Sequence, residues 1–111
     1  MEKENKKVEE IFNQGVDYLE NGQLKDAIES FEEVIKLDAQ DASAHFNLGL
    51  ACMRAAREDI NKKELYEEKT DEEAWLLRAI SEFNKVLEFE PENKEAKENI
   101  EALNKLLGMG V

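Results

Sequence analysis

The chain has 111 residues, of which 38% are charged, and a formal net charge of −12; this length fits one domain. Nucleic acid and anionic membranes are bound through Lys and Arg, so the charge argues against both as partners. A single Cys and a single His exclude an intrachain disulfide and a zinc cluster. No signal-peptide core and no membrane-length apolar run of about 18 residues is present, so we expect a cytoplasmic protein.

The first two predicted helices form a pair. One runs from Val8 to Asn21 and carries two adjacent apolar stripes; Gly22 is expected to cap its end. The second runs from Leu24 to Leu37. The stripes of the first helix are Val8, Ile11, Gly15 and Tyr18, and beside them Phe12, Val16 and Leu19. The apolar face of the second helix is formed by Ala27, Ile28, Phe31, Val34 and Ile35.

Three further helices are predicted downstream. The third opens at Ser43 and continues past Ala56. The fourth begins near a capping box, "TDEE" at residues 70–73, and is stopped by Pro91. The fifth, "ENKEAKENIEALNKLLG", ends at Gly108. With a single proline and no alternating strand pattern, the sequence predicts an all-α fold of five helices.

Two segments of the chain repeat at two different spacings. Phe12, Gly15 and Leu19 recur 34 residues later as Phe46, Gly49 and Met53. The helix with Ala27 and Phe31 recurs 52 residues later with Ala79 and Phe83. The second copy therefore contains about 18 additional residues between its two helices.

Helix–turn–helix units with a 34-residue period resemble tetratricopeptide repeats. The residues that carry the resemblance are Gly15, Tyr18, Ala27 and Phe31 in the first copy, and Leu48, Gly49, Ala79, Phe83 and Pro91 in the second. The sequence departs from the family pattern at Ile11 and His45, where Trp is usual, and at Gln14, Ala39 and Cys52. The resemblance implies one domain over residues 1–111, with repeats at 8–41 and 42–93 and a capping helix at 94–108.

The insertion, at about residues 57–74, is interpreted as a lengthening of the second helical hairpin. If both helices share it, each gains about two and a half turns, or about 13 Å. Leu65, Tyr66, Trp75 and Leu76 would then meet at the hairpin tip. A flexible loop over residues 60–69 is the alternative.

The resemblance implies a protein-interaction module whose concave groove is lined by the first helix of each repeat. The groove residues are expected to be Phe12, Asn13, Val16, Leu19, Phe46, Asn47, Leu50 and Met53. An apolar groove with amides fits an apolar or mildly basic peptide or helix. The structural alternative is that these residues are core between packed helices. The functional alternative to peptide binding is a homodimer joined through the groove or the hairpin tip.

The sequence contains no residue pattern typical of a catalytic site. His45 lies among apolar residues and is interpreted as a structural histidine, and Cys52 as a small core residue. Acidic pairs are too frequent to single out one for acid–base catalysis, and no phosphate-binding glycine loop is present. We therefore expect no enzyme activity, no cofactor and no metal.

Overall fold

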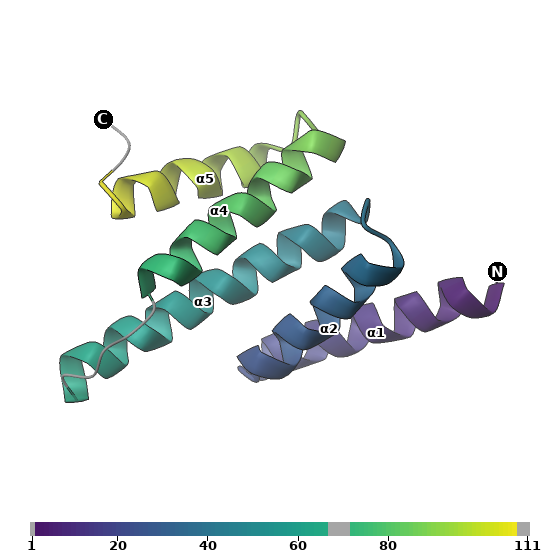
Figure 1. The fold of residues 1–111 in the computed structure, drawn as a ribbon, viewed down its shortest axis with the longest axis horizontal. Coiled ribbons are helices and arrows are strands. Elements are labelled where there is room, and N and C mark those ends of the chain that lie inside the picture. The colour runs from purple at the N-terminus through teal and green to yellow at the C-terminus, as the bar shows by residue number, and fades with distance from the viewer. Residues whose placement is uncertain (1, 67–71, 109–111) are drawn as a thin grey trace.

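A computed structural model describes residues 2–66 and 72–108, with side chains for 6–58 and 72–108. These residues form five helices and no strand: α1 (Glu2–Glu20), α2 (Leu24–Leu37), α3 (Ala42–Tyr66), α4 (Glu72–Phe89) and α5 (Lys94–Leu106) (Figure 1). The all-α prediction is confirmed. The capping box predicted at Thr70 begins outside the described residues.

Local signals explain where several helices begin and end. Gly22, with φ of 75°, follows α1 in the left-handed conformation that glycine adopts without strain. The amides of Gly22 and Gln23 bond back to the carbonyls of Leu19 and Tyr18, a Schellman ending. The start of α3 differs from the prediction. Asp41, rather than Ser43, is the cap, because its carboxylate accepts the Ala44 amide at 2.9 Å.

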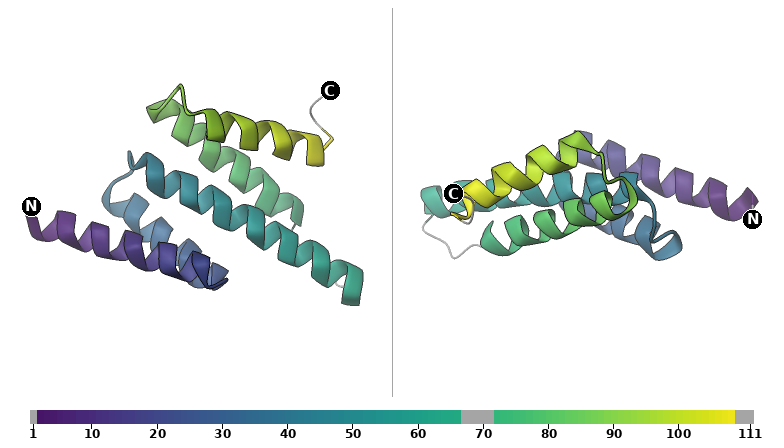
Figure 2. Two further views of the ribbon diagram at one scale, coloured as in Figure 1. Left: turned by 180° about the vertical axis from the view of Figure 1, so that it is seen from behind. Right: turned by 90° about the horizontal axis from the view of Figure 1, so that it is seen from above.

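The helices pack as two antiparallel hairpins followed by a single helix. Helix α1 pairs with α2, α3 pairs with α4, and α5 packs against α4 (Figure 1). Seen from behind, α1, α3 and α5 lie nearer the viewer than α2 and α4 (Figure 2). The first helix of each unit and the last helix therefore share one layer, and the second helices form the other.

The same contact holds each hairpin together. Phe31 of α2 and Phe83 of α4 are fully buried. Gly15 and Gly49 lie directly against these rings, and a Cβ added at either glycine would come within 2.8 Å of a ring carbon. The ring occupies the space that a side chain would fill, so the crossing helices can approach closely. The glycine and the phenylalanine are thus a matched pair in both hairpins.

The insertion lengthens the two helices of the second hairpin unequally, contrary to the prediction of equal shares. Helix α3 ends at Tyr66, twelve residues beyond Arg54, which is the counterpart of Glu20 at the end of α1. Helix α4 begins at Glu72, four residues before Leu76, the counterpart of Leu24. Twelve residues of helix correspond to about 18 Å, so most of the protrusion belongs to α3. The loop alternative is wrong for residues 60–66, which are helical.

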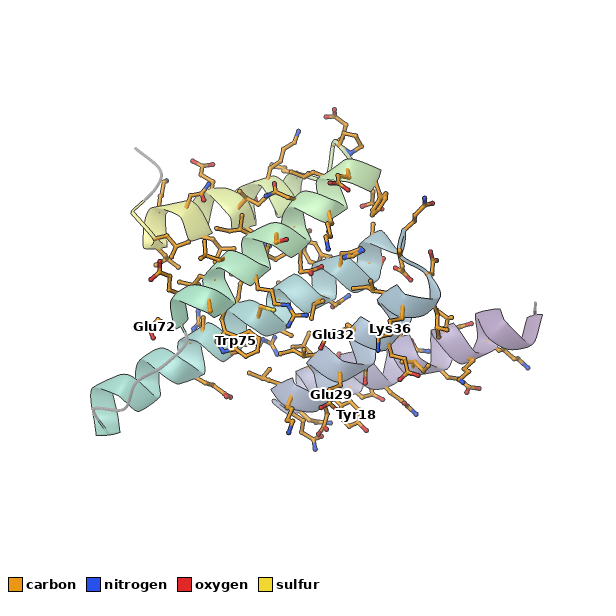
Figure 3. The ribbon with its side chains drawn as sticks, viewed as in Figure 1. Tyr18, Glu29, Glu32, Lys36, Glu72 and Trp75 are labelled. Carbon is orange, nitrogen blue, oxygen red and sulfur yellow. The ribbon has the colours of Figure 1, made fainter. Side chains whose placement is uncertain are left out.

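The predicted apolar cluster at the hairpin tip is also wrong for two of its members. Leu76 is 8% exposed and belongs to the main core, and Trp75 packs against that core. Figure 3 shows Trp75 near the first turns of α4, on the side that faces α3 and α2. Both residues lie too close to the core for the tip because α4 gains only about one turn. The side chains of Leu65 and Tyr66 lie outside the described residues.

Cys52 is fully buried in this core. Burial disfavours the thiolate and raises the thiol pKa from its ordinary value of 9.0 to about 12. Because the thiolate is the reactive form, we expect a thiol reagent to leave the native protein unlabelled and to react quickly with the unfolded chain.

The raised pKa of Cys52 also predicts a pH dependence of stability. The contribution of the buried thiol to the free energy of unfolding is fully present below pH 9 and is lost as pH rises from 9 toward 12. Urea titrations of the wild type and Cys52→Ala at several pH values would measure this, with a smaller loss expected in the variant.

Candidate partner-binding groove

The four predicted groove residues on α3 form a half-buried stripe. Phe46, Asn47, Leu50 and Met53 are all intermediate in exposure, and the three apolar ones pack against the core with one side. They lie on the layer of α1, α3 and α5 and line two hollows along α3. The structure therefore brings these residues to one surface, and whether a partner binds there stays a prediction.

The predicted residues on α1 differ more among themselves. Asn13 is exposed, Phe12 and Val16 are half-buried, and Leu19 is only 5% exposed. Leu19 is therefore core, and its backbone carbonyl accepts a hydrogen bond from Arg54 at 2.7 Å. Its side chain leaves little surface for a partner.

Phe12 and Phe46 each contribute to the core as well as to the surface. Phe12 meets Phe31 edge-to-face at 5.7 Å between ring centroids, and Phe46 meets Phe83 in the same way at 5.3 Å. Such pairs stabilise a core beyond simple burial. Phe12 and Phe46 are therefore both core and surface, because each ring packs on a buried ring while the residue stays half-buried.

The larger hollow lies between α3, α4 and α5. It has a volume of about 360 Å³ and its apolar lining comes from all three helices: Leu50, Met53, Ala56, Leu76, Leu103 and Leu106. Arg54 and Arg57 complete the lining. Leu106 is 70% exposed, so this apolar surface is open to solvent on the side of α5.

The smaller hollow lies at the other end of the same stretch of α3, beside the turn into α5. Its volume is about 180 Å³, and it is lined by Ala42, Ser43, Phe46, Asn47, Glu90, Asn93 and Glu95. The Asn47 amide donates to the Ser43 carbonyl at 2.9 Å, which uses one of its two amide hydrogens. Asn93 caps α5 by accepting the Ala96 amide at 2.9 Å. This end is polar and acidic.

His45 is buried beneath this surface and joins three parts of the fold. Its Nε2 is 2.9 Å from the Ala39 carbonyl oxygen and its Nδ1 is 2.7 Å from a carboxyl oxygen of Glu82. A carbonyl only accepts, so Nε2 carries a proton and donates to Ala39. The Nδ1–carboxyl contact then requires one more proton, held by either partner. Glu82 is 6% exposed, so this is a buried polar connection between α3, α4 and the α2–α3 turn. The sequence predicted a structural histidine but not its partners.

Sequence reasoning missed Arg54, Arg57, Leu103 and Leu106 as parts of the surface. The two arginines lie on the predicted third helix, but its stripe stopped at Met53. Leu103 and Leu106 are on the capping helix, for which the sequence predicted no groove residue. A signal was available in the i, i+3 spacing of Arg54 and Arg57, which places them on one helix face.

The described residues contain no group of three or more His, Cys, Asp or Glu side chains that could hold a metal ion. Within the same part of the chain, no helix is both long and apolar enough to cross a membrane. The groove itself presents apolar side chains, the Asn47 amide, and charged side chains of opposite sign in its two hollows.

These features define a helical-hairpin repeat protein with a groove along its second unit. A family model described as a TPR repeat matches residues 15–55, from the middle of α1 into α3. This match covers the first hairpin and the start of the second, and the five-helix architecture agrees with the fold of tetratricopeptide repeats. Tetratricopeptide repeats generally mediate protein–protein interaction or scaffolding. No match was found among curated proteins.

Proposed function

We propose that the chain binds an apolar or mildly basic peptide or helix of a partner protein along α3. The observation that carries this proposal is the open apolar hollow of about 360 Å³ beside a stripe that is only half-buried. Exposed apolar surface of this kind is uncommon on a monomer without a partner. Phe46, Leu50 and Met53 supply contact area, and Asn13 and Asn47 offer hydrogen bonds to a partner backbone.

The expected partner is a protein, with no cofactor and no catalytic step. The charge of −12 favours a partner that carries basic residues and disfavours nucleic acid and anionic membranes. These preferences rest on charge and composition, and the function they favour is that of a scaffold or adaptor, for which we propose a cytoplasmic location.

A test is to select binding peptides from a displayed random library on the immobilised protein and to measure their affinity for variants. Met53→Gln keeps side-chain length and helix propensity but removes the apolar contact, so we expect about tenfold weaker binding. Leu77→Gln is the matched control, because Leu77 is 46% exposed on α4, outside the lining of either hollow. Circular dichroism verifies that both variants remain helical. Equal binding by the wild type and Met53→Gln would contradict the proposal.

Self-association is the second candidate, and the exposed Leu106 beside the hollow favours it. Two copies could cover each other's apolar surface. Light scattering over a wide concentration range separates the two functions. A dimer that Leu106→Ser converts to a monomer would favour assembly, whereas a monomer at all concentrations would favour peptide binding.

A further inference from the structure

The groove along α3 has ends of opposite charge. The smaller hollow, at the start of α3, is lined by Glu90 and Glu95. The larger hollow, formed farther along α3, is lined by Arg54 and Arg57, and no carboxylate is among the described residues that line it. The chain has a net charge of −12, so two cations without an acid in the described lining make this hollow locally basic.

The two arginines belong to the same stretch of α3 and line the same hollow. They are three residues apart on α3, so they project from the same face. Arg54 donates through one terminal nitrogen to the Leu19 carbonyl at 2.7 Å, which orients its guanidinium and leaves other N–H groups free to donate. Arg57 is exposed, and no ion pair joins it to another described residue. Guanidinium groups bind carboxylates through paired hydrogen bonds.

An apolar floor lies beside these cations. Leu76 and Leu103 are buried, and Leu50 and Met53 are half-buried. A volume of about 360 Å³ lies within the range of ligand-binding pockets. A large aliphatic or aromatic side chain can therefore enter, and an acidic neighbour of that side chain would lie at the arginines.

We propose that the larger hollow recognises an apolar anchor residue with an adjacent carboxylate on the partner segment. This inference rests on the proposed function and specifies it: Arg54 and Arg57 hold the acidic group, the leucines and Met53 hold the anchor, and Glu90 and Glu95 attract the basic residues farther along the segment. Opposite charges at the two ends give the bound segment a fixed direction along α3.

Two small fluorescent probes test the chemistry of the hollow. 1-Anilinonaphthalene-8-sulfonate combines aromatic rings with one anionic group, and N-phenyl-1-naphthylamine has the same rings without the charge. We expect both to bind and the anionic probe to bind more tightly. Arg57→Gln should weaken the anionic probe about fivefold and leave the neutral probe unchanged.

Two further variants locate the effect. Lys85→Gln removes the same formal charge from an exposed position on α4, so it controls for net charge and should leave both probes unaffected. Leu106→Ser, at a position that is 70% exposed, should weaken both probes without unfolding the chain. Circular dichroism of every variant checks that the helices are intact.

Each outcome decides a separate claim. Loss of the anionic probe alone in Arg57→Gln supports recognition of an anionic group, for which the sulfonate of the probe stands in for the carboxylate. Equal binding of both probes, unaffected by Arg57→Gln, overturns it but leaves the apolar groove of the proposed function in place. Equal losses in Arg57→Gln and Lys85→Gln overturn it as a net-charge effect. Binding of neither probe overturns the inference, and the library selection with Met53→Gln then decides the proposed function independently.

Discussion

Gly49→Ala is expected to lower the free energy of unfolding by about 2 kcal/mol, although alanine forms helix better than glycine by about 1 kcal/mol. The reason is the Phe83 ring, which an added Cβ would approach to 2.8 Å. Phe83 is fully buried and its neighbours are close-packed, so the ring has little room to retreat. Urea unfolding followed by the helical circular dichroism signal would measure the change.

The cause can be isolated by repeating the substitution in a Phe83→Leu background. Leucine lacks the ring atoms that meet the new methyl group, so Gly49→Ala should there be neutral or stabilising. Asn84→Ala, at an exposed position of α4, controls for the gain in helix propensity alone. An equal cost of Gly49→Ala in both backgrounds would show that contact with the ring is not responsible. Gly15→Ala with Phe31→Leu should behave in the same way in the first hairpin.

Glu82→Ala is expected to destabilise the protein by about 3 kcal/mol, the cost of removing one member of a buried polar pair. His45 is 2% exposed, and Glu82 is the group that faces its Nδ1 at 2.7 Å. The substitution leaves this nitrogen buried without its partner. It also loosens the link from α3 to α4, which supports the surface above it. Chemical unfolding of the variant against wild type measures the loss.

Glu82→Gln provides the informative comparison. Its amide can donate to Nδ1 of a neutral imidazole whose Nε2–H still donates to Ala39, so most of the stability should return. Glu32→Ala is the matched control, since the Glu32–Arg78 pair also spans two helices at 2.9 Å but is over one-third exposed, and it should cost no more than about 1 kcal/mol. Equal effects of Glu82→Ala and Glu32→Ala would contradict the importance given to burial.

The sequence by itself determined the helices and their pairing. Helix α2 runs from Leu24 to Leu37, as its apolar period and the preceding Gly22 predicted. These signals are local, because they reflect hydrogen bonds and backbone preferences within a few residues. The matched repeats also indicated that Gly15 and Gly49 occupy equivalent positions in the two hairpins, as do Phe31 and Phe83.

The tertiary structure alone decided how the surface is built. The His45–Glu82 contact spans 37 positions and the Arg54–Leu19 bond spans 35, so neither has a local signal. The unequal division of the insertion depends on where α4 resumes packing, which places Leu76 in the core. Half-burial of Phe46 and Met53 is likewise set by neighbouring helices. An apolar stripe shows which face is covered, but the depth to which each residue is covered depends on packing partners distant in the sequence.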